Sequence, residues 1–144
     1  MLELPDARIV ERCNAVSEKI IGAAIEVHRH FGPGLLESAY EAFLCREMTL
    51  RGLQVRQQVA LPVSYKGVQV ECGYRLDILV DGLVIVELKS VERVEPIHEA
   101  QLLTYLKLSD LYLGLLLNFR EELLKKGIHR VINPRAGNNL SQLS

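Results

Sequence analysis

Apolar residues recur every three or four positions through the first fifty residues, a spacing that predicts two amphipathic helices. Asp6 can cap the first helix, and the sequence "FGPG" at residues 31–34 stops it. Its expected buried stripe consists of Ile9, Cys13, Val16, Ile20, Ala24, Val27 and Phe31. The second helix is expected over residues 35–52, and the short connecting loop predicts that the two helices pack as a pair. Its expected buried side consists of Leu36, Tyr40, Phe43, Leu44 and Glu47.

After residue 52 the spacing changes to the alternation typical of β-strands. Strands are predicted over residues 53–65, 68–80, 83–90, 110–119 and 128–132, the last at a sheet edge, and a short amphipathic stretch over residues 120–127. Pro96 opens a helix over residues 96–108, and Gly73 is expected to kink the long second strand. The order ααβββαββ predicts one α/β domain over residues 1–144, with a mixed sheet flanked by helices. The tail from about residue 134 is expected to fray.

Composition narrows the class of protein. A chain of 144 residues is long enough for one domain with a real core. The net charge of −1 shows no basic excess that would indicate nucleic-acid binding, although a site built from carboxylates would itself lower the net charge. No apolar run predicts a membrane span, and the first residues predict no secretory signal. Cys13, Cys45 and Cys72 are odd in number and far apart, which argues against disulfides or a Cys-based zinc site and favours a reducing cytoplasm.

The stretch "YRLDILVDGLVIVELKS", residues 74–90, reads as two buried strands joined by a tight turn, yet it contains Asp77, Glu87 and Lys89. The even-numbered strand positions are all apolar: Leu76, Ile78, Val80, Val84, Val86 and Leu88. They share a face only if the loop has an odd number of residues, and a three-residue loop with a left-handed Gly82 meets that condition. In this register Asp77, Glu87 and Lys89 fall together on the other face.

This grouping predicts chemistry as well as structure. Charge inside a hairpin is costly unless something compensates it. Paired carboxylates can hold a hard divalent cation such as magnesium, which polarises a phosphoryl oxygen and lowers the pKa of bound water. Lys89, two residues from Glu87 on the same strand face, could orient that water. On spacing alone, a solvated strand face bearing a Glu87–Lys89 ion pair is an equal alternative.

Three motifs resemble those of a known superfamily. The sequence "LDILV…VELK" resembles the D…(D/E)xK signature of the PD-(D/E)XK nuclease superfamily. "QLLTY" at residues 101–105 resembles the QxxxY motif of its RecB-type branch, and "GLLESAY" at residues 34–40 matches the motif of the GxxExxY protein family within that superfamily. The flanking sequences "IIGAAIEVHRHFGPG", "LLNF" and "GIHRVIN" match too, so the resemblance covers roughly residues 9–133.

The resemblance implies a restriction-endonuclease-like domain whose motif-bearing core spans about residues 34–118. It implies a three-stranded meander that carries the site, followed by a helix and a further strand. Asp77 and Glu87 would be ligands of Mg²⁺ or Mn²⁺, with the Leu88 carbonyl as a further ligand. Glu37 matches the glutamate of the first helix that completes the site in RecB-like members.

The remaining motif residues would act on water and substrate. By the resemblance, Lys89 would position or activate the attacking water, and Gln101 and Tyr105 would support the lysine and the substrate. The implied activity is metal-dependent hydrolysis of phosphodiester bonds in DNA, with RNA as the second choice. The alternative is a non-catalytic module that retains the fold and binds nucleic acid or protein. A homodimer is expected, because one small domain covers little of a duplex.

Each motif residue also has a structural interpretation. Glu37 lies in the first turn of its helix, where a carboxylate favours the helix dipole without any metal. Gln101 and Tyr105 share a helix face, and their alternative is a solvated amide beside a tyrosine at the core margin. His98 extends that face and could touch phosphate, but a surface histidine is the simpler interpretation. His28 and His30 diverge on a helix and do not form a zinc pair. Further candidates for phosphate contacts, each of which can equally be a solvated charge, are Arg29, Lys66, Arg93 and Arg130.

Overall fold

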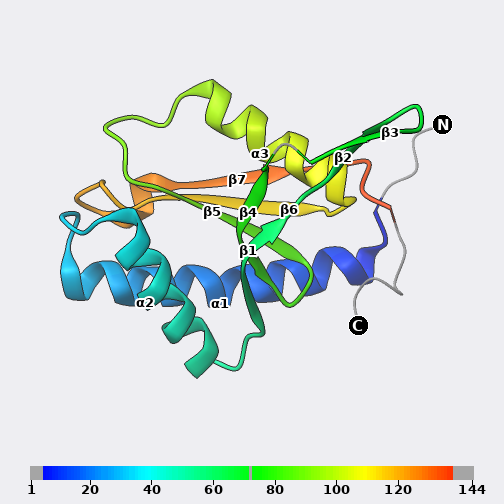
Figure 1. The fold of residues 1–144 in the computed structure, drawn as a ribbon. Helices are drawn as coiled ribbons and strands as arrows, with labels where there is room; N and C mark the ends of the chain where they lie inside the picture. Colours follow the sequence, from blue (N-terminus) through cyan, green and yellow to red (C-terminus); the bar gives the residue numbers. More distant parts are fainter. Residues whose placement is uncertain (1–4, 72, 138–144) are drawn as a thin grey trace.

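Three layers of secondary structure make up the computed structural model, which describes residues 5–71 and 73–137 (Figure 1). The helices of these residues are α1 (Ala7–Phe31), α2 (Glu37–Leu50), α3 (Pro96–Ser109) and a short 3₁₀-helix, η1 (Leu124–Gly127). The strands are β1 (Val55–Ala60), β2 (Val63–Tyr65), β3 (Val68–Val70), β4 (Arg75–Val80), β5 (Val84–Lys89), β6 (Leu113–Asn118) and β7 (Ile128–Ile132).

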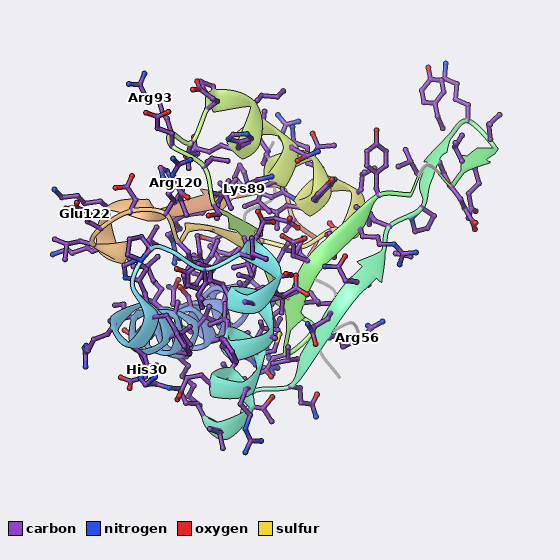
Figure 2. All side chains as sticks on the ribbon, turned by 60° about the vertical axis from the view of Figure 1, so that its left-hand side comes forward. His30, Arg56, Lys89, Arg93, Arg120 and Glu122 are labelled. Carbon is purple, nitrogen blue, oxygen red and sulfur yellow. The ribbon has the colours of Figure 1, made fainter. Side chains whose placement is uncertain are left out.

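Five of the strands form one mixed sheet in the order β1-β4-β5-β6-β7. Strands β5 and β6 run parallel, and the other neighbouring pairs are antiparallel. The α1–α2 pair covers one face of the sheet, and α3, which connects β5 to β6, covers the other (Figure 1). The β2–β3 hairpin forms a separate small sheet that projects from the body of the molecule (Figures 1 and 2). The predicted fold class is confirmed, and β7 lies at the sheet edge as predicted.

Two of the predicted strands are each divided, so the element order is ααβββββαββ instead of ααβββαββ. Residues 53–65 form β1 and β2, which separate at Pro62 because proline has no N–H to donate to a ladder. Residues 68–80 form β3 and β4, which separate around Gly73, where φ is 76°. The kink predicted at Gly73 is therefore a complete break, and it lets the β2–β3 hairpin leave the plane of the main sheet.

The core has one part on each face of the sheet. Helix α1 buries its predicted stripe except for Phe31, which is partly exposed. Helix α2 buries Tyr40, Leu44, Cys45 and Met48. Leu36 and Phe43 were predicted to be buried but are exposed: the helix begins only after Leu36, and the Phe43 ring stacks on Phe31 at the surface, with ring centroids 4.8 Å apart. Glu47 forms an ion pair with Arg51 at 3.0 Å instead of facing the core.

The β4–β5 hairpin has the predicted register. Val80 pairs with Val84, so the loop holds three residues, and Gly82 has the predicted positive φ of 65°. Asp81 also has a positive φ, 53°, and its carboxylate accepts a hydrogen bond from the Gln54 N–H at 2.7 Å. One even-numbered residue departs from prediction: Leu76 packs with the core part under α3, whereas the other five pack against α1 and α2. The two strands thus lose their common face at the end where Asp77 lies.

The chain remains packed just past β7. The Asn133 side chain donates to the carbonyl of Leu111 at 3.2 Å, and the Gly137 N–H donates to Asp110 at 2.5 Å. Ala136 between them is buried. The first residues of the tail that was expected to fray are therefore bonded to the loop before β6, and residues 138–144 lie outside the described part of the chain.

Tyr40 fixes the loop that leads into α2. Its hydroxyl donates to the Gly32 carbonyl and accepts a hydrogen bond from the Leu35 N–H at 3.1 Å. The buried ring stacks on Phe119, which follows β6, with ring centroids 4.5 Å apart. The tyrosine of the "GLLESAY" motif therefore ties both ends of the α1–α2 loop to the sheet, and it determines where the N-terminus of α2, and with it Glu37, is held.

We expect Tyr40→Phe to lower the free energy of unfolding by about 1–3 kcal/mol, because the substitution keeps the ring but leaves the Leu35 N–H and the Gly32 carbonyl without their partner. Urea unfolding followed by circular dichroism measures this change. Tyr65→Phe on the exposed β2 strand is the control and should unfold like the wild type. Equal unfolding midpoints for Tyr40→Phe and the wild type would show that the hydroxyl does not hold the loop.

Candidate active site

The predicted site residues come from all three layers and meet at one end of β4 and β5. Asp77 lies on β4, and Glu87 and Lys89 lie on β5. Glu37 is the first residue of α2, and Tyr105 faces them from α3. Figure 2 shows Lys89 between α3 and α2. Glu37 and Tyr105, which are 68 residues apart in the sequence, therefore both lie within reach of the Asp77 charge.

The β4–β5 ladder stops at the candidate carboxylates. Its last regular pair on this side is Ile78 with Val86. Beyond it, the Asp77 N–H donates to the Glu87 side chain at 3.2 Å, and the Leu88 N–H donates to the Asp77 carboxylate at 2.9 Å. Side-chain oxygens thus take the place of backbone carbonyls, so the two strands separate without leaving these N–H groups unsatisfied.

Strand β1 is also distorted at this level. The β1–β4 register pairs Gln57 with Ile78 and Val59 with Leu76, which places Gln58 opposite Asp77 but outside the ladder. Gln58 has φ of 51°, a conformation that a residue with a side chain adopts only when its surroundings enforce it. The sheet therefore departs from regular geometry on both sides of Asp77.

Glu87 is buried, with 8% of its surface exposed. Burial, followed by the charge of Asp77 and a hydrogen bond between the two side chains, raises the pKa of Glu87 from 4.5 to about 9. Lys89 lowers the pKa of Glu87, but not enough to offset these effects. At neutral pH, and with no cation beside it, Glu87 therefore keeps its proton.

Glu37 shares the same electrostatic environment from the α2 side. Partial burial, and then the charge of Asp77, raise its pKa, whereas Lys89 and a hydrogen bond from the Ser90 backbone lower it. The side chain stays accessible to solvent at the start of the helix. Glu37 lies in the first turn of α2, where the helix dipole favours a carboxylate, as its structural interpretation requires. The charges of Asp77 and Lys89 also act on it.

Helix α3 contributes one buried and one exposed motif residue. Tyr105 is buried, and its pKa is raised by burial, then by the charges of Glu87, Tyr74 and Asp77 in that order. Gln101 lies one turn earlier on the same helix and is exposed. The predicted pair is therefore divided: the tyrosine lies at the carboxylates, and the glutamine faces solvent beside it.

Most of the other sequence candidates have local partners instead. The His98 imidazole accepts a hydrogen bond from the Glu95 N–H at 3.0 Å and so caps α3. Arg130 donates to Asn14 and Ser17 on α1. His28 is buried and bonds to the Glu121 carbonyl at 2.7 Å. Arg29 forms an ion pair with Glu26 at 3.6 Å, and the Lys66 ammonium lies 5.2 Å from the Tyr65 ring centroid.

Asn118 is a site residue that sequence reasoning missed. It ends β6 beside Lys89 and is buried. Its side chain accepts from the N–H groups of Val91 and Arg120 at 3.1 and 3.3 Å and donates to the Val91 carbonyl at 2.8 Å. Asn118 therefore fixes the loop that follows Lys89. A polar residue at the end of an otherwise apolar strand, "LGLLLN", was the available signal.

The donor set fits a divalent cation in its chemistry. Asp77 and Glu87 are two adjacent carboxyl groups whose negative charge Lys89 offsets only in part, and hard cations prefer such oxygen ligands. The Leu88 N–H points at the Asp77 carboxylate. The N–H and the carbonyl of one strand residue face the same neighbouring strand, so the Leu88 carbonyl also faces β4. Among residues 5–71 and 73–137, however, no three His, Cys, Asp or Glu side chains converge as ready metal ligands.

A mixed sheet whose β4–β5 hairpin opens at Asp77, Glu87 and Lys89 is what a nuclease-type α/β domain would have. The family model of the PD-(D/E)XK nuclease superfamily matches residues 14–131, and the chain belongs to this superfamily, whose members generally use divalent metal ions. No curated protein and no solved structure gives a significant match. The superfamily predicted from the motifs is confirmed, whereas membership of the GxxExxY family and of the RecB-like branch stays a prediction.

We expect Glu87→Gln to stabilise the metal-free protein at pH 8 more than at pH 5. The raised pKa means that the Glu87 contribution to stability is fully present below about pH 4.5 and is lost as pH rises towards and through 9. Glutamine stays neutral and can still donate to Asp77. Because one pKa unit corresponds to about 1.4 kcal/mol, the gain should reach a few kcal/mol at pH 8.

Urea unfolding in EDTA at the two pH values measures this difference. Glu92→Gln, on the exposed loop after β5, is the matched control and should not change the pH dependence. If Glu87→Gln shifts stability equally at pH 5 and pH 8, the pKa of Glu87 in the folded protein is not raised above its value in the unfolded chain.

Proposed function

We propose that the protein is a divalent-metal-dependent nuclease that hydrolyses phosphodiester bonds in DNA. The observation that carries this proposal is the pair formed by the half-buried Asp77 and the buried Glu87, in a hairpin that opens where they lie. Such a pair is unfavourable in an apolar interior unless a positive charge joins it. Membership of the PD-(D/E)XK superfamily supports a nuclease-type activity for this protein, which we assign to Asp77 and Glu87.

The chain supplies the groups that the reaction needs around a cation. Asp77, Glu87 and the Leu88 carbonyl would hold Mg²⁺ or Mn²⁺, with Glu37 completing the set from α2. When bound, the cation supplies the charge that polarises the phosphoryl oxygen and lowers the pKa of a water. Lys89 lies on the same strand as Glu87, and its charge acts on both Glu37 and Glu87. From this position it would hold and orient the attacking water.

Helix α3 and the loop after β5 serve the substrate. Gln101 is exposed next to the buried Tyr105, so its amide can contact the substrate. Arg93 lies on the loop after β5, which Asn118 binds through Val91. Arg120 lies on the loop after β6, and its N–H also donates to Asn118. Both arginines are exposed on the same side of the molecule as Lys89 in Figure 2. They are the candidates for phosphate contacts on either side of the reacting bond.

Several expectations from the sequence stay predictions. DNA is the proposed substrate and RNA the second choice, and the proposed cation is Mg²⁺ or Mn²⁺. The homodimer rests on the small footprint of a single domain of this size. In the described residues, no helix combines the length and the apolarity that crossing the bilayer requires. The cytoplasmic location still rests on the pattern of cysteines.

A second candidate function is a non-catalytic module that binds nucleic acid or protein. One observation favours it, namely that no three metal ligands converge within the described residues. Metal binding separates the two candidates, because a nuclease must bind Mg²⁺ or Mn²⁺ through Asp77 and Glu87 and a binding module need not.

We expect Asp77→Asn to abolish both Mn²⁺ binding and cleavage while leaving the metal-free protein equally or more stable. The substitution removes the repulsion between two carboxyl groups, and the asparagine oxygen can still accept from the Leu88 N–H. Mn²⁺ titration by calorimetry, cleavage of linear, circular and branched DNA, and urea unfolding test the three parts.

The control for Asp77→Asn is Glu11→Gln on the exposed side of α1, which should cleave like the wild type. A variant at Asp77 that unfolds readily would identify this residue as a structural partner. Wild-type protein that binds Mn²⁺ but cleaves neither DNA nor RNA would favour the binding module.

We expect Lys89→Arg to lose roughly a hundredfold or more in single-turnover cleavage, in the range of general acid–base contributions. The planar guanidinium is wider than the ammonium and would misplace a water that must be held in one position. Mn²⁺ binding should survive, since the ligands are unchanged. Near-wild-type cleavage by the arginine variant would mean that Lys89 only balances charge.

A further inference from the structure

A groove runs between α3 and the base of the β2–β3 hairpin, directly beside the candidate active site. Its volume is about 400 Å³. It is lined from α3 by Ile97, Ala100, Gln101, Thr104, Tyr105 and Leu108, and from the hairpin side by Val63 and Tyr74. Tyr105 therefore belongs both to the groove and to the candidate site, which makes the two continuous.

The lining contains no charged side chain, which distinguishes the groove from the site next to it. Ile97 and Tyr74 are 69% and 43% exposed, so large apolar surfaces stand open to solvent there. The Tyr74 and Tyr105 rings lie 6.1 Å apart between centroids, at 60° to each other. An uncharged, mostly apolar groove would not stabilise a phosphate, but it suits a neutral and flat group that stacks on an aromatic ring.

The polar atoms in the groove are few. The Thr104 hydroxyl already donates to the Ala100 carbonyl at 3.1 Å, so it is occupied on its donor side. The Gln101 amide is exposed and carries both donors and an acceptor, which match the hydrogen-bonding edge of a nucleobase. The groove thus combines an aromatic face, apolar walls and one adaptable amide.

We propose that this groove binds an unpaired nucleobase adjacent to the reacting phosphate, so that the substrate is single-stranded or locally unpaired nucleic acid. This inference rests on the proposed function and specifies its substrate. A base stacked on Tyr74 lies beside Tyr105, whose hydroxyl feels the charges of Glu87 and Asp77. The phosphate joined to that base would then lie at the open end of β4 and β5. A base held within a duplex cannot enter such a groove without leaving its stack.

The binding experiment uses the full chain with Asp77→Asn to prevent cleavage. Fluorescein-labelled single-stranded DNA, the same strand with one abasic position at its centre, and its fully paired duplex are titrated by fluorescence anisotropy. Tyr74→Ala and, separately, Ile97→Ala should each weaken binding of the single strand by about tenfold, within the range for loss of one stacked base. Duplex binding should change less than twofold.

The control variants separate stacking from general damage. Tyr74→Phe keeps the ring and should bind the single strand like the parent protein. Leu50→Ala removes an exposed apolar side chain at the end of α2 and should have no effect. The abasic strand should bind more weakly to the parent protein and should be less sensitive to Tyr74→Ala.

The outcomes distinguish this inference from the proposed function. Equal losses for single strand and duplex, or no loss for Tyr74→Ala and Ile97→Ala, would overturn the groove as a base site even if the wild type cleaves DNA. Tyr74-dependent binding of single strands by a protein that cleaves nothing would support the groove and overturn the nuclease. If Tyr74→Ala instead dissociates a dimer in sedimentation and leaves strand binding unchanged, the groove holds a second copy of the chain.

Discussion

The pair formed by the buried Glu87 and the half-buried Asp77 is the constraint around which the rest of the structure is arranged. Two carboxyl groups in an apolar interior are unfavourable unless they gain hydrogen bonds and a positive charge. The hydrogen bonds come from the strand backbones, which give up two ladder positions to supply the Asp77 and Leu88 N–H groups. The positive charge is supplied only in part by Lys89, and the raised pKa of Glu87 keeps that side chain neutral.

Keeping the strands apart at one end requires support from every layer. On the β6 side, the Asn118 side chain replaces backbone partners for the loop that follows Lys89. On the α2 side, Tyr40 fixes the loop that places Glu37. Under α3, the buried Tyr105 lies where the charges of Glu87 and Asp77 raise its pKa. None of these residues supplies a carboxylate of the pair, yet each limits how far the two strands can move.

Periodicity predicted α1, α2, α3, the mixed sheet and the β4–β5 register, because burial on one face imposes a regular spacing on the chain. It failed where a single backbone group decides the outcome, as at Pro62 and Gly73, since apolar alternation continues across both breaks. Parity placed Glu87 and Lys89 on one strand face, but Leu76 leaves the common apolar face beside Asp77, so the contact of Asp77 with Glu87 depends on the opening of the hairpin. Contacts across the layers, such as those of Asn118 and Tyr40, depend on packing that no local pattern records.

The division between the charged opening and the uncharged groove has a physical basis. A phosphodiester is charged and must lie where cations and donors gather, whereas its base is neutral and flat and is stabilised by surfaces that exclude charge. The two chemistries have to be close because one nucleotide carries both. Tyr105 of helix α3 borders both: the charges of Glu87 and Asp77 act on its hydroxyl, and its side chain lines the groove together with Gln101 and Ile97. The same helix that buries the sheet can therefore align phosphate and base relative to each other.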